Sequence, residues 1–199
     1  MMNLEQRISG MSPEKQQAIR LSHEYLTPKR VETWLSWDLP LVIGRREGYR
    51  IWDKDGDELQ DCHLNGGTYN LGHRHPELVA QLQDGLTTLD VGNHHFPSAA
   101  RGLLAEQLAV HTPGELHYTI FTPSGSEAND VAIKSARFAT GRRKIVALDA
   151  GYHGRTGLSG AAGDNETAIF FHSDYPDEFI KVAFNDLDAM KHALSAGDV

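Results

Sequence analysis

The chain has 199 residues, of which 40% are hydrophobic and 23% are charged, as is typical of a folded globular protein and not of a disordered or fibrous one. Its 19 basic and 27 acidic residues give a formal net charge of -8, which disfavours nucleic acid or an anionic membrane as the main partner. The polar N-terminus predicts no signal peptide, and no apolar run approaches the roughly 20 residues of a membrane-spanning helix.

Near the N-terminus the sequence predicts a short helix. Ser12 is a residue type that caps helices, and Pro13 would stand in the first turn, where its missing N–H has no helical partner to lose. Four residues are expected to share one face of this helix: Ala18, Leu21, Ser22 and Tyr25.

A β-hairpin is predicted next. Residues 49–52 and 58–62 flank a turn around Asp55-Gly56 and are expected to form its two strands. Cys62, at the end of the second strand, is the only cysteine and cannot form an internal disulfide. We therefore expect Cys62 to pack in or beside a strand, and the lack of a disulfide predicts a cytoplasmic protein.

The spacing of Asp53, Asp55 and Asp57 suggests a calcium-binding loop at first sight. Such a loop requires glycine at its sixth position and glutamate at its twelfth. Those positions hold Glu58 and Leu64, so the pattern favours a solvated turn.

From Pro76 onward, helical patterns alternate with short apolar runs. Helices are predicted over residues 77–89, 98–111, 126–140 and 186–194, and strands over residues 117–122, 144–148 and 181–184. Leucines are expected on the inner faces of the first two helices, and a strand, a helix and a strand in succession predict a parallel sheet covered by helices. The fold class expected is α/β with a doubly wound sheet.

A tight turn between residues 121 and 126 is the strongest candidate site. The chain passes through Ser124, Gly125 and Ser126 into a helix, whose first N–H groups lack partners and can bind an anion such as phosphate. Glu127 would repel that anion and is expected to point away from it. The local pattern leaves two interpretations open for Ser126, a phosphate ligand or a simple helix cap.

Histidine and arginine side chains are candidates for metal ligands and for partners of a substrate carboxylate. Four histidines lack a cysteine or paired acid at ligand spacing, so no metal site is predicted at His73, His75, His94 and His95. Three arginines are candidate partners for a carboxylate: Arg74, Arg101 and Arg155.

Two longer strings carry a family resemblance. SGSEANDVAIKSARFATGR, followed by KIVALDAGYHGRTGLS, resembles the corresponding stretch of class III aminotransferases, a branch of the fold type I enzymes that use pyridoxal 5'-phosphate (PLP). The GHRHP string at residues 72–76 is similar to the segment leading into the large domain of that family. The resemblance runs from about residue 49 to the C-terminus.

This resemblance implies a cofactor site. Gly125 and Ser126 would hold the PLP phosphate, and Ser124 would shape the turn. Tyr152 would lay its ring against the pyridine face, a favourable arrangement for an electron-poor ring; the alternative is an aromatic side chain that packs the loop. His153 would contact the ring substituents or the substrate.

The resemblance also implies where the catalytic residues and the domain boundary lie. No catalytic residue is expected within this chain, because the Schiff-base lysine and the aspartate that binds the pyridine nitrogen are expected beyond Val199. Residues 1–75 would contribute to a small domain, and residues 76–199 would form the first part of the PLP-binding large domain. Alone, the chain is therefore expected to be inactive.

For the intact protein, the resemblance implies transfer of an amino group from an amino donor to an oxo acceptor. Alternatives are an aminomutase, racemase or decarboxylase of the same superfamily, or a truncated, non-catalytic fragment that pairs with a full-length homologue. A homodimer is also implied, with residues 92–97 as an interface loop.

Overall fold

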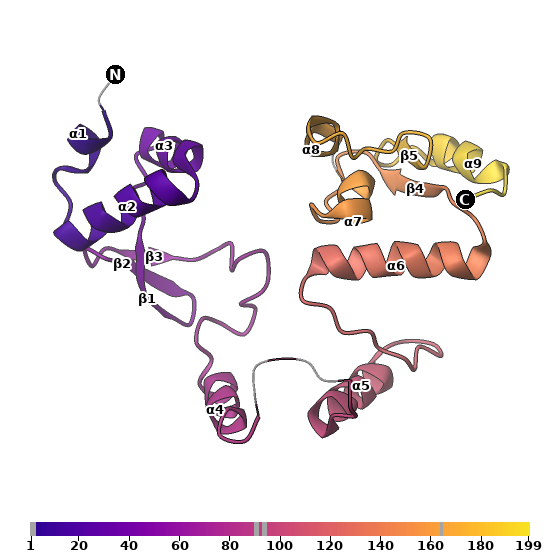
Figure 1. Cartoon of the computed structure of the whole chain (residues 1–199), viewed down its shortest axis with the longest axis horizontal. Coiled ribbons are helices and arrows are strands. Elements are labelled where there is room, and N and C mark those ends of the chain that lie inside the picture. The colour runs from indigo at the N-terminus through magenta and orange to yellow at the C-terminus, as the bar shows by residue number, and fades with distance from the viewer. Residues whose placement is uncertain (1–2, 90–91, 93–94, 164) are drawn as a thin grey trace. The chain divides into compact units, whose positions relative to one another are not determined.

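The computed structural model describes residues 3–89, 92, 95–163 and 165–199 (Figure 1). The chain divides into two compact units, Met1–His94 and His95–Val199. No helix in the described ranges is long and apolar enough to cross a bilayer.

The first unit combines N-terminal helices with an antiparallel sheet in the order β1-β2-β3. Its elements are α1 (Leu4–Ile8), α2 (Pro13–Tyr25), α3 (Pro28–Ser36), β1 (Ile43–Glu47), β2 (Arg50–Asp53), β3 (Glu58–Gln60) and α4 (Pro76–Gly85). The predicted hairpin is confirmed, with Ile51 of β2 opposite Leu59 of β3. Strand β1 was not predicted, because its sequence IGRRE has no alternation of apolar and polar residues and all five residues are exposed.

Helix α2 starts as predicted, with the Ser12 hydroxyl accepting a hydrogen bond from the Lys15 N–H. Its inner face is only partly the predicted one, since Ala18 and Ser22 are half-buried. Lys15 and Ile19, one turn apart, are buried, whereas Leu21 and Tyr25 are exposed. An ion pair between Lys15 and the hairpin turn sets this face, and an apolar pattern cannot reveal it.

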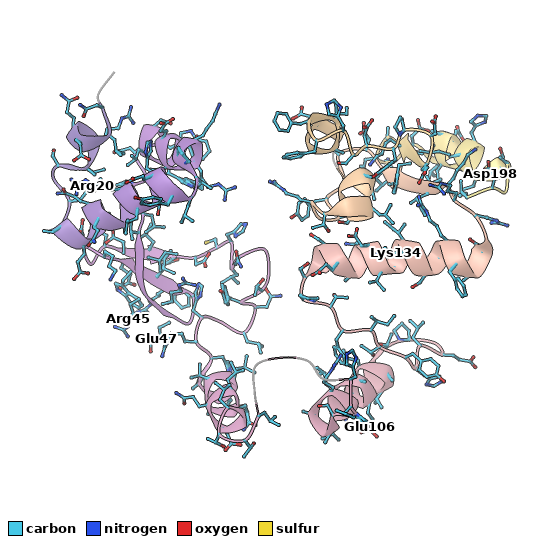
Figure 2. All side chains as sticks on the ribbon, viewed as in Figure 1. Arg20, Arg45, Glu47, Glu106, Lys134 and Asp198 are labelled. Carbon is cyan, nitrogen blue, oxygen red and sulfur yellow. The ribbon has the colours of Figure 1, made fainter. Side chains whose placement is uncertain are left out.

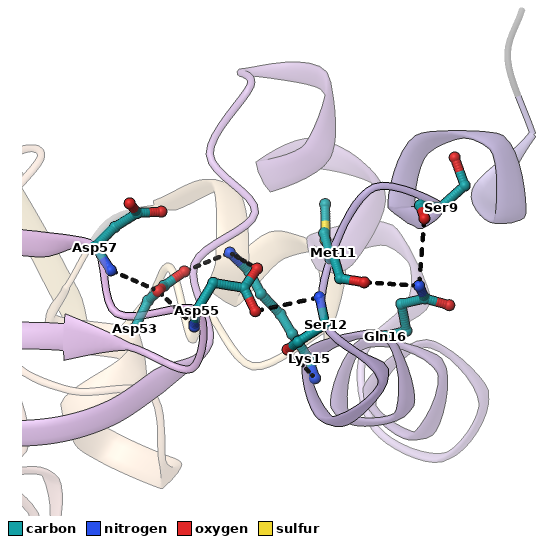
Figure 3. Close-up of polar contacts among 8 residues, drawn as sticks. All are labelled: Ser9, Met11, Ser12, Lys15, Gln16, Asp53, Asp55 and Asp57. Carbon is teal, nitrogen blue, oxygen red and sulfur yellow. Dashed lines mark hydrogen bonds and ion pairs between the residues drawn. The ribbon is translucent and has the colours of Figure 1, made fainter.

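That ion pair joins two segments 38 positions apart (Figure 3). Lys15 and Asp53 are only 4% and 6% exposed, and the Lys15 ammonium contacts the Asp53 carboxylate. A second carboxylate, that of Asp55, lies 3.3 Å from Lys15 Nζ. The prediction of a solvated turn is therefore wrong for Asp53, which is buried against a lysine side chain.

Backbone hydrogen bonds complete this buried pair. Asp53 Oδ1 accepts hydrogen bonds from the N–H groups of Asp55 at 2.8 Å and Asp57 at 3.1 Å. Burial alone would raise the pKa of Asp53, but the hydrogen bonds from Lys15 and these N–H groups hold it below the ordinary value. Burial would likewise lower the pKa of Lys15, and its two carboxylate partners raise it instead.

The second unit contains a parallel pair of strands among its helices. Its elements are α5 (Ala99–His111), α6 (Gly125–Thr140), β4 (Ile145–Leu148), α7 (Gly157–Ala162), α8 (Asn165–Phe170), β5 (Phe179–Val182) and α9 (Leu187–Ser195). Ile145 lies opposite Phe179 and Leu148 opposite Val182. Helix α7 contacts both α6 and β4 (Figure 1), and its Ala161 and Ala162 form a small core with Ala147 and Phe179.

Helix ends in this unit follow the sequence closely. Ser98 caps α5, Asp186 caps α9, and Gly141 ends α6 in the left-handed conformation at φ 68°. Each of these residues satisfies a backbone group at a helix end or adopts a conformation that favours glycine there. These residues account for where α5 and α9 begin and where α6 ends.

Two predicted strands differ from the structure. Residues 117–122 form no strand, because no described segment pairs with them to accept ladder hydrogen bonds. The parallel crossover instead runs from β4 through α7 and α8 to β5. The last strand lies at Phe179–Val182, two residues before the predicted range, and leaves Phe184 83% exposed.

Several side chains that were expected to be buried are exposed in the structure. The leucines on α4 and α5 that were predicted to face inward are exposed, since no described element packs over those faces: Leu78, Leu82, Leu86, Leu104 and Leu108. Cys62 is also exposed and not packed beside a strand. The hydrophobic pattern identifies the apolar face of each helix but not whether another element covers it.

Candidate functional site

Helix α6 begins at a serine cap. Ser124 is the N-cap, and its Oγ accepts a hydrogen bond from the Glu127 N–H at 3.3 Å. The cap interpretation thus applies to Ser124, and Ser126 stands inside the first turn. The N–H groups of Gly125 and Ser126 have no acceptor within the helix, and no described group accepts from either.

Glu127 folds back onto the cap. Its carboxylate accepts a hydrogen bond from the Ser124 hydroxyl at 3.1 Å. Because this hydroxyl donates to Glu127 and accepts from the Glu127 N–H, it has no hydrogen left for an anion. Ser124 therefore shapes the turn, and the donors available at this helix end come from Gly125 and Ser126.

The loop after β4 lies against this helix start. Gly154 has a φ of 123°, and a Cβ there would stand 2.4 Å from Ser126 Oγ and 2.7 Å from Ser126 Cα. Only glycine satisfies both the conformation and the space. The loop that carries Tyr152 and His153 is therefore packed directly onto Ser126.

A hydrogen bond closes the same junction. The Arg155 N–H donates to Ser126 Oγ at 3.3 Å. The hydroxyl hydrogen of Ser126 has no acceptor among the described residues, so it can be donated to a bound group. Tyr152, two residues before Gly154 in the same loop, is 71% exposed, so its ring can stack on a flat ligand.

Two residues of α6 that were not singled out from the sequence hold this loop. The Asn129 amide donates to the His153 carbonyl at 2.7 Å and to the Gly125 carbonyl at 3.1 Å. The Asp130 carboxylate accepts from the Ser159 N–H at 2.6 Å and from the Thr156 hydroxyl at 3.0 Å. Their position three and four residues after Ser126, on one helix face, was an available signal, because Asn and Asp are disfavoured inside helices.

The structure thus brings together the five residues predicted to bind the cofactor. Ser124, Gly125 and Ser126 form the start of α6, and Tyr152 and His153 lie in the loop fastened to it. The arrangement offers two backbone donors, one hydroxyl donor and one exposed aromatic ring. It can bind a phosphate attached to a flat aromatic group.

Of the other candidates, Arg155 contributes its backbone N–H to this junction, and Arg101 and His73 have partners of their own. The Arg101 guanidinium lies 5.3 Å from the centre of the Phe121 ring. His73 is buried and shares a 2.7 Å hydrogen bond with Asp61. Hydrogen bonds from the Leu64 N–H and from His73 hold the pKa of Asp61 below its ordinary value.

No cluster of three or more potential metal ligands occurs among the residues that the structure describes, a set that excludes His94.

Comparison with known proteins identifies the family. The sequence profile of the class III aminotransferases matches residues 35–196. The match covers most of the chain and includes both the α6 start and the loop after β4. The chain belongs to the class III aminotransferase family.

Three curated relatives share this similarity. An uncharacterized aminotransferase of Archaeoglobus fulgidus is 44% identical over 180 residues, which cover 90% of this chain and 42% of that protein. The acetylornithine aminotransferase of Halalkalibacterium halodurans is 34% identical over 82% of this chain and 41% of its own length. The glutamate-1-semialdehyde 2,1-aminomutase of Methanothrix thermoacetophila is 32% identical over 80% of this chain and 38% of its own. The chain spans about two-fifths of the length of these relatives.

Solved structures show the same fold. The ornithine aminotransferase of Toxoplasma gondii matches with a TM-score of 0.78 and 21% identity, over 100% of this chain and 47% of that one. The taurine:2-oxoglutarate aminotransferase of Bifidobacterium kashiwanohense, solved with PLP and glutamate, matches with a TM-score of 0.73 and 23% identity, over 92% and 44%. The architecture is PLP fold type I, with mixed α/β structure and partial sheets.

Proposed function

We propose that the protein containing this chain transfers an amino group from a small amino donor to a small oxo acceptor, with PLP as its cofactor. The observation that carries this proposal is the junction of the α6 start with the loop after β4. Free donors from Gly125 and Ser126 stand there, and the loop packed onto Ser126 carries the exposed Tyr152. Family membership supports the same conclusion.

The residues present fit PLP on chemical grounds. A phosphate ester needs hydrogen-bond donors without a competing carboxylate, and Glu127 is turned onto the Ser124 hydroxyl. The Gly125 and Ser126 N–H groups and the Ser126 hydroxyl would bind the phosphate, while Tyr152 would cover one face of the ring and His153 would lie next to it. When bound, PLP supplies an electron sink and carries the amino group.

The remaining parts of the enzyme are also proposals. We place no catalytic residue within residues 1–199, and expect the lysine that carries PLP and the aspartate that protonates its ring beyond Val199. The greater length of the relatives supports this expectation. A homodimer in the cytoplasm is proposed as well, with residues 92–97 at the interface; residues 93 and 94 of that loop lie outside the described part of the chain.

The division into a small-domain segment, residues 1–75, and a large-domain segment, residues 76–199, stays a prediction. Within this chain α4 clusters with the first unit, whose boundary follows His94.

A second candidate activity is an intramolecular amino transfer, as in an aminomutase. The relative from Methanothrix thermoacetophila, named as a 2,1-aminomutase, favours keeping this alternative. Both activities would use the same cofactor site. They differ in whether a separate oxo acceptor is consumed, which product analysis with one substrate at a time distinguishes.

The test of the proposed site is Ser126→Ala in the intact holoenzyme. We expect PLP affinity to fall by about 1–3 kcal/mol, the scale of a hydrogen bond to a charged group. Affinity is measured by equilibrium titration followed by cofactor absorbance. Ser195→Ala, which removes an exposed hydroxyl bonded to the His192 carbonyl in α9, is the matched control. Unchanged PLP affinity in Ser126→Ala would refute the phosphate assignment.

A further inference from the structure

We propose that Asn129 is a positioning residue that sets Tyr152 and His153 relative to the start of α6. This inference rests on the proposed function, because it concerns the geometry of the same cofactor site. The evidence is a single side-chain amide that bonds the helix start and the loop at once.

The Asn129 amide nitrogen has two hydrogens and two carbonyl acceptors. It donates to Gly125 O at 3.1 Å and to His153 O at 2.7 Å. Both N–H bonds are therefore used. The first acceptor is part of the proposed phosphate turn, and the second belongs to the residue after Tyr152. Asn129 thus ties the phosphate turn to the stacking residue through one planar group.

The loop has few other means of holding Tyr152 in place. Its ring is 71% exposed, so side-chain packing supplies little restraint. Ala150, two residues before Tyr152, has a positive φ of 57°, a conformation that a residue other than glycine keeps only where surrounding contacts impose it. The position of Tyr152 must therefore be set by hydrogen bonds to the loop backbone. The bond from Asn129 to the His153 carbonyl acts on the residue directly after Tyr152.

Other contacts with α6 hold the later residues of the loop, from Arg155 onward, and do not involve Tyr152 or His153. The Arg155 N–H bonds to Ser126 Oγ, two residues beyond His153. Asp130 holds Thr156 and the Ser159 N–H, and thereby caps the first turn of α7 in place of a side-chain cap from Thr156. Among the described residues, Asn129 makes the side-chain contact from α6 to the backbone next to Tyr152.

The test compares Asn129→Ala and Asn129→Asp with Lys134→Ala in the intact holoenzyme. Lys134 lies on the same helix, exposed and away from the loop (Figure 2). We expect both Asn129 variants to weaken PLP binding about 3- to 10-fold, the effect of one lost hydrogen bond. They should also alter the visible circular dichroism of bound PLP, while Lys134→Ala changes neither property.

Asn129→Asp separates positioning from simple packing. Aspartate has the same shape but cannot donate to the His153 carbonyl, so loss in this variant does not come from volume. Its carboxylate would also repel a phosphate, whereas alanine adds no charge, so similar losses in both variants report the missing hydrogen bond. It also keeps the test available if Asn129→Ala does not fold. An Asn129→Asp holoenzyme with unchanged PLP affinity and unchanged circular dichroism would overturn the proposal.

A double-mutant cycle with Tyr152→Leu tests whether Asn129 acts through the stacking ring. If it does, Asn129→Ala has little further effect on PLP affinity once the ring is gone. Fully additive effects of the two changes would contradict this role.

Ser126→Ala distinguishes failure of this inference from failure of the proposed function. If Ser126→Ala weakens PLP binding and Asn129→Asp does not, only the positioning role is wrong. If Ser126→Ala has no effect, the phosphate assignment is wrong and the positioning role falls with it.

Discussion

Gly154 and Ser126 form the tightest contact of the candidate site. Gly154 has two constraints, a φ of 123° and a neighbouring serine that would lie 2.4 Å from any Cβ. The first is a local backbone requirement, and the second depends on where α6 lies. A sequence can suggest the first, since YHGR reads as a loop, but it cannot reveal the second.

We predict that Gly154→Ala lowers PLP affinity more than an alanine at another glycine with a positive φ, because the new Cβ also collides with Ser126. The added methyl group must displace Ser126 or the loop, so PLP affinity in the holoenzyme should fall at least as far as in Ser126→Ala. Gly141→Ala is the matched control, because Gly141 also has a positive φ, 68°, but has open space around its Cβ. That control should lose only about 1–2 kcal/mol of stability from backbone strain.

The comparison needs both thermal unfolding and PLP titration for each variant. A Gly154→Ala protein that binds PLP as tightly as the Gly141→Ala protein would show that the contact with Ser126 is unimportant for the site.

At the residue level, the sequence predicted an anion-binding turn but left the separate roles of its two serines ambiguous. Ser124 and Ser126 are both suitable caps, and only the structure shows that Ser124 bonds the Glu127 N–H. Asn129 and Asp130 were missed because their partners are the His153 carbonyl, the Thr156 hydroxyl and a backbone N–H. The two polar side chains on the helix face of Ser126 were a signal in the sequence, but the backbone groups that they bind cannot be identified from it.

Among the elements, α2 and the hairpin are joined by a charge and not by an apolar stripe. Lys15 lies where a helical pattern would place a hydrophobic residue, and it is buried against Asp53 (Figure 3). The D-x-D-x-D turn surrounds this ammonium group with carboxylates from Asp53 and Asp55. Removal of one partner from a buried ion pair of this kind destabilises the fold strongly, because the other charge stays buried without a counter-ion.

We predict that Lys15→Met lowers the free energy of unfolding of the first unit by about 3–5 kcal/mol at pH 7. Removal of the lysine leaves the Asp53 carboxylate buried without its counter-ion. Urea unfolding followed by tryptophan fluorescence measures this unit selectively, because all 3 tryptophans of the chain lie within it. Lys54→Met is the matched control: the Lys54–Glu14 pair joins the same turn to α2 but is exposed, so its loss should cost no more than about 1 kcal/mol.

The effect of Lys15→Met should depend on pH in a defined direction. Asp53 has a lowered pKa in the folded state, so its stabilisation is present above its unfolded pKa of about 3.9 and is lost as pH falls through the lower folded value. Lys15 has a raised pKa, so its stabilisation is present below about 10.4 and is lost as pH rises through the higher folded value. Without Lys15 the pKa of Asp53 in the folded variant is higher than in wild type, so the difference should be constant around neutral pH and shrink as pH falls through that value. A difference that grows as pH falls would contradict this assignment.

Elements whose ends carry capping residues were predicted well, and elements that depend on distant pairing were not. The starts of α2, α5 and α9 follow from Ser12, Ser98 and Asp186, because a cap acts within one turn. Residues 117–122 have strand-forming side chains but no pairing partner in the described structure. Strand formation requires that partner, and its presence cannot be derived from the segment itself.

For the molecule as a whole, the sequence indicated the fold class through a few local motifs. The phosphate turn, the YHG loop and the GHRHP string together identified the family that the profile match shows. The burial of helix faces was less predictable, because leucines of α4 and α5 are exposed in this chain. Burial depends on which elements pack together, and periodicity shows only that an apolar face exists.

The last prediction concerns residues 1–199 by themselves. Expressed alone, mixed with PLP and reduced with borohydride, they should acquire no stoichiometric pyridoxyl adduct on any one lysine and should catalyse no amino transfer. A lysine that bonds covalently to PLP must be near the phosphate site and must lose its proton. Lys134 is on α6 but lies nine residues after Gly125, about 13 Å along the helix axis.

Most other lysines are held by partners that favour the charged form or fix the side chain elsewhere. Lys15 has a raised pKa beside Asp53, Lys144 lies 2.5 Å from an Asp198 carboxylate oxygen, and Lys181 donates to the Gly163 carbonyl. Peptide mapping by mass spectrometry, with an assay of amino transfer on the same sample, tests the prediction. Lys29→Ala and Lys134→Ala, which remove exposed lysines, control for scattered surface labelling. A single lysine labelled one-to-one, together with turnover, would place the catalytic lysine inside this chain and contradict our assignment of it to residues beyond Val199.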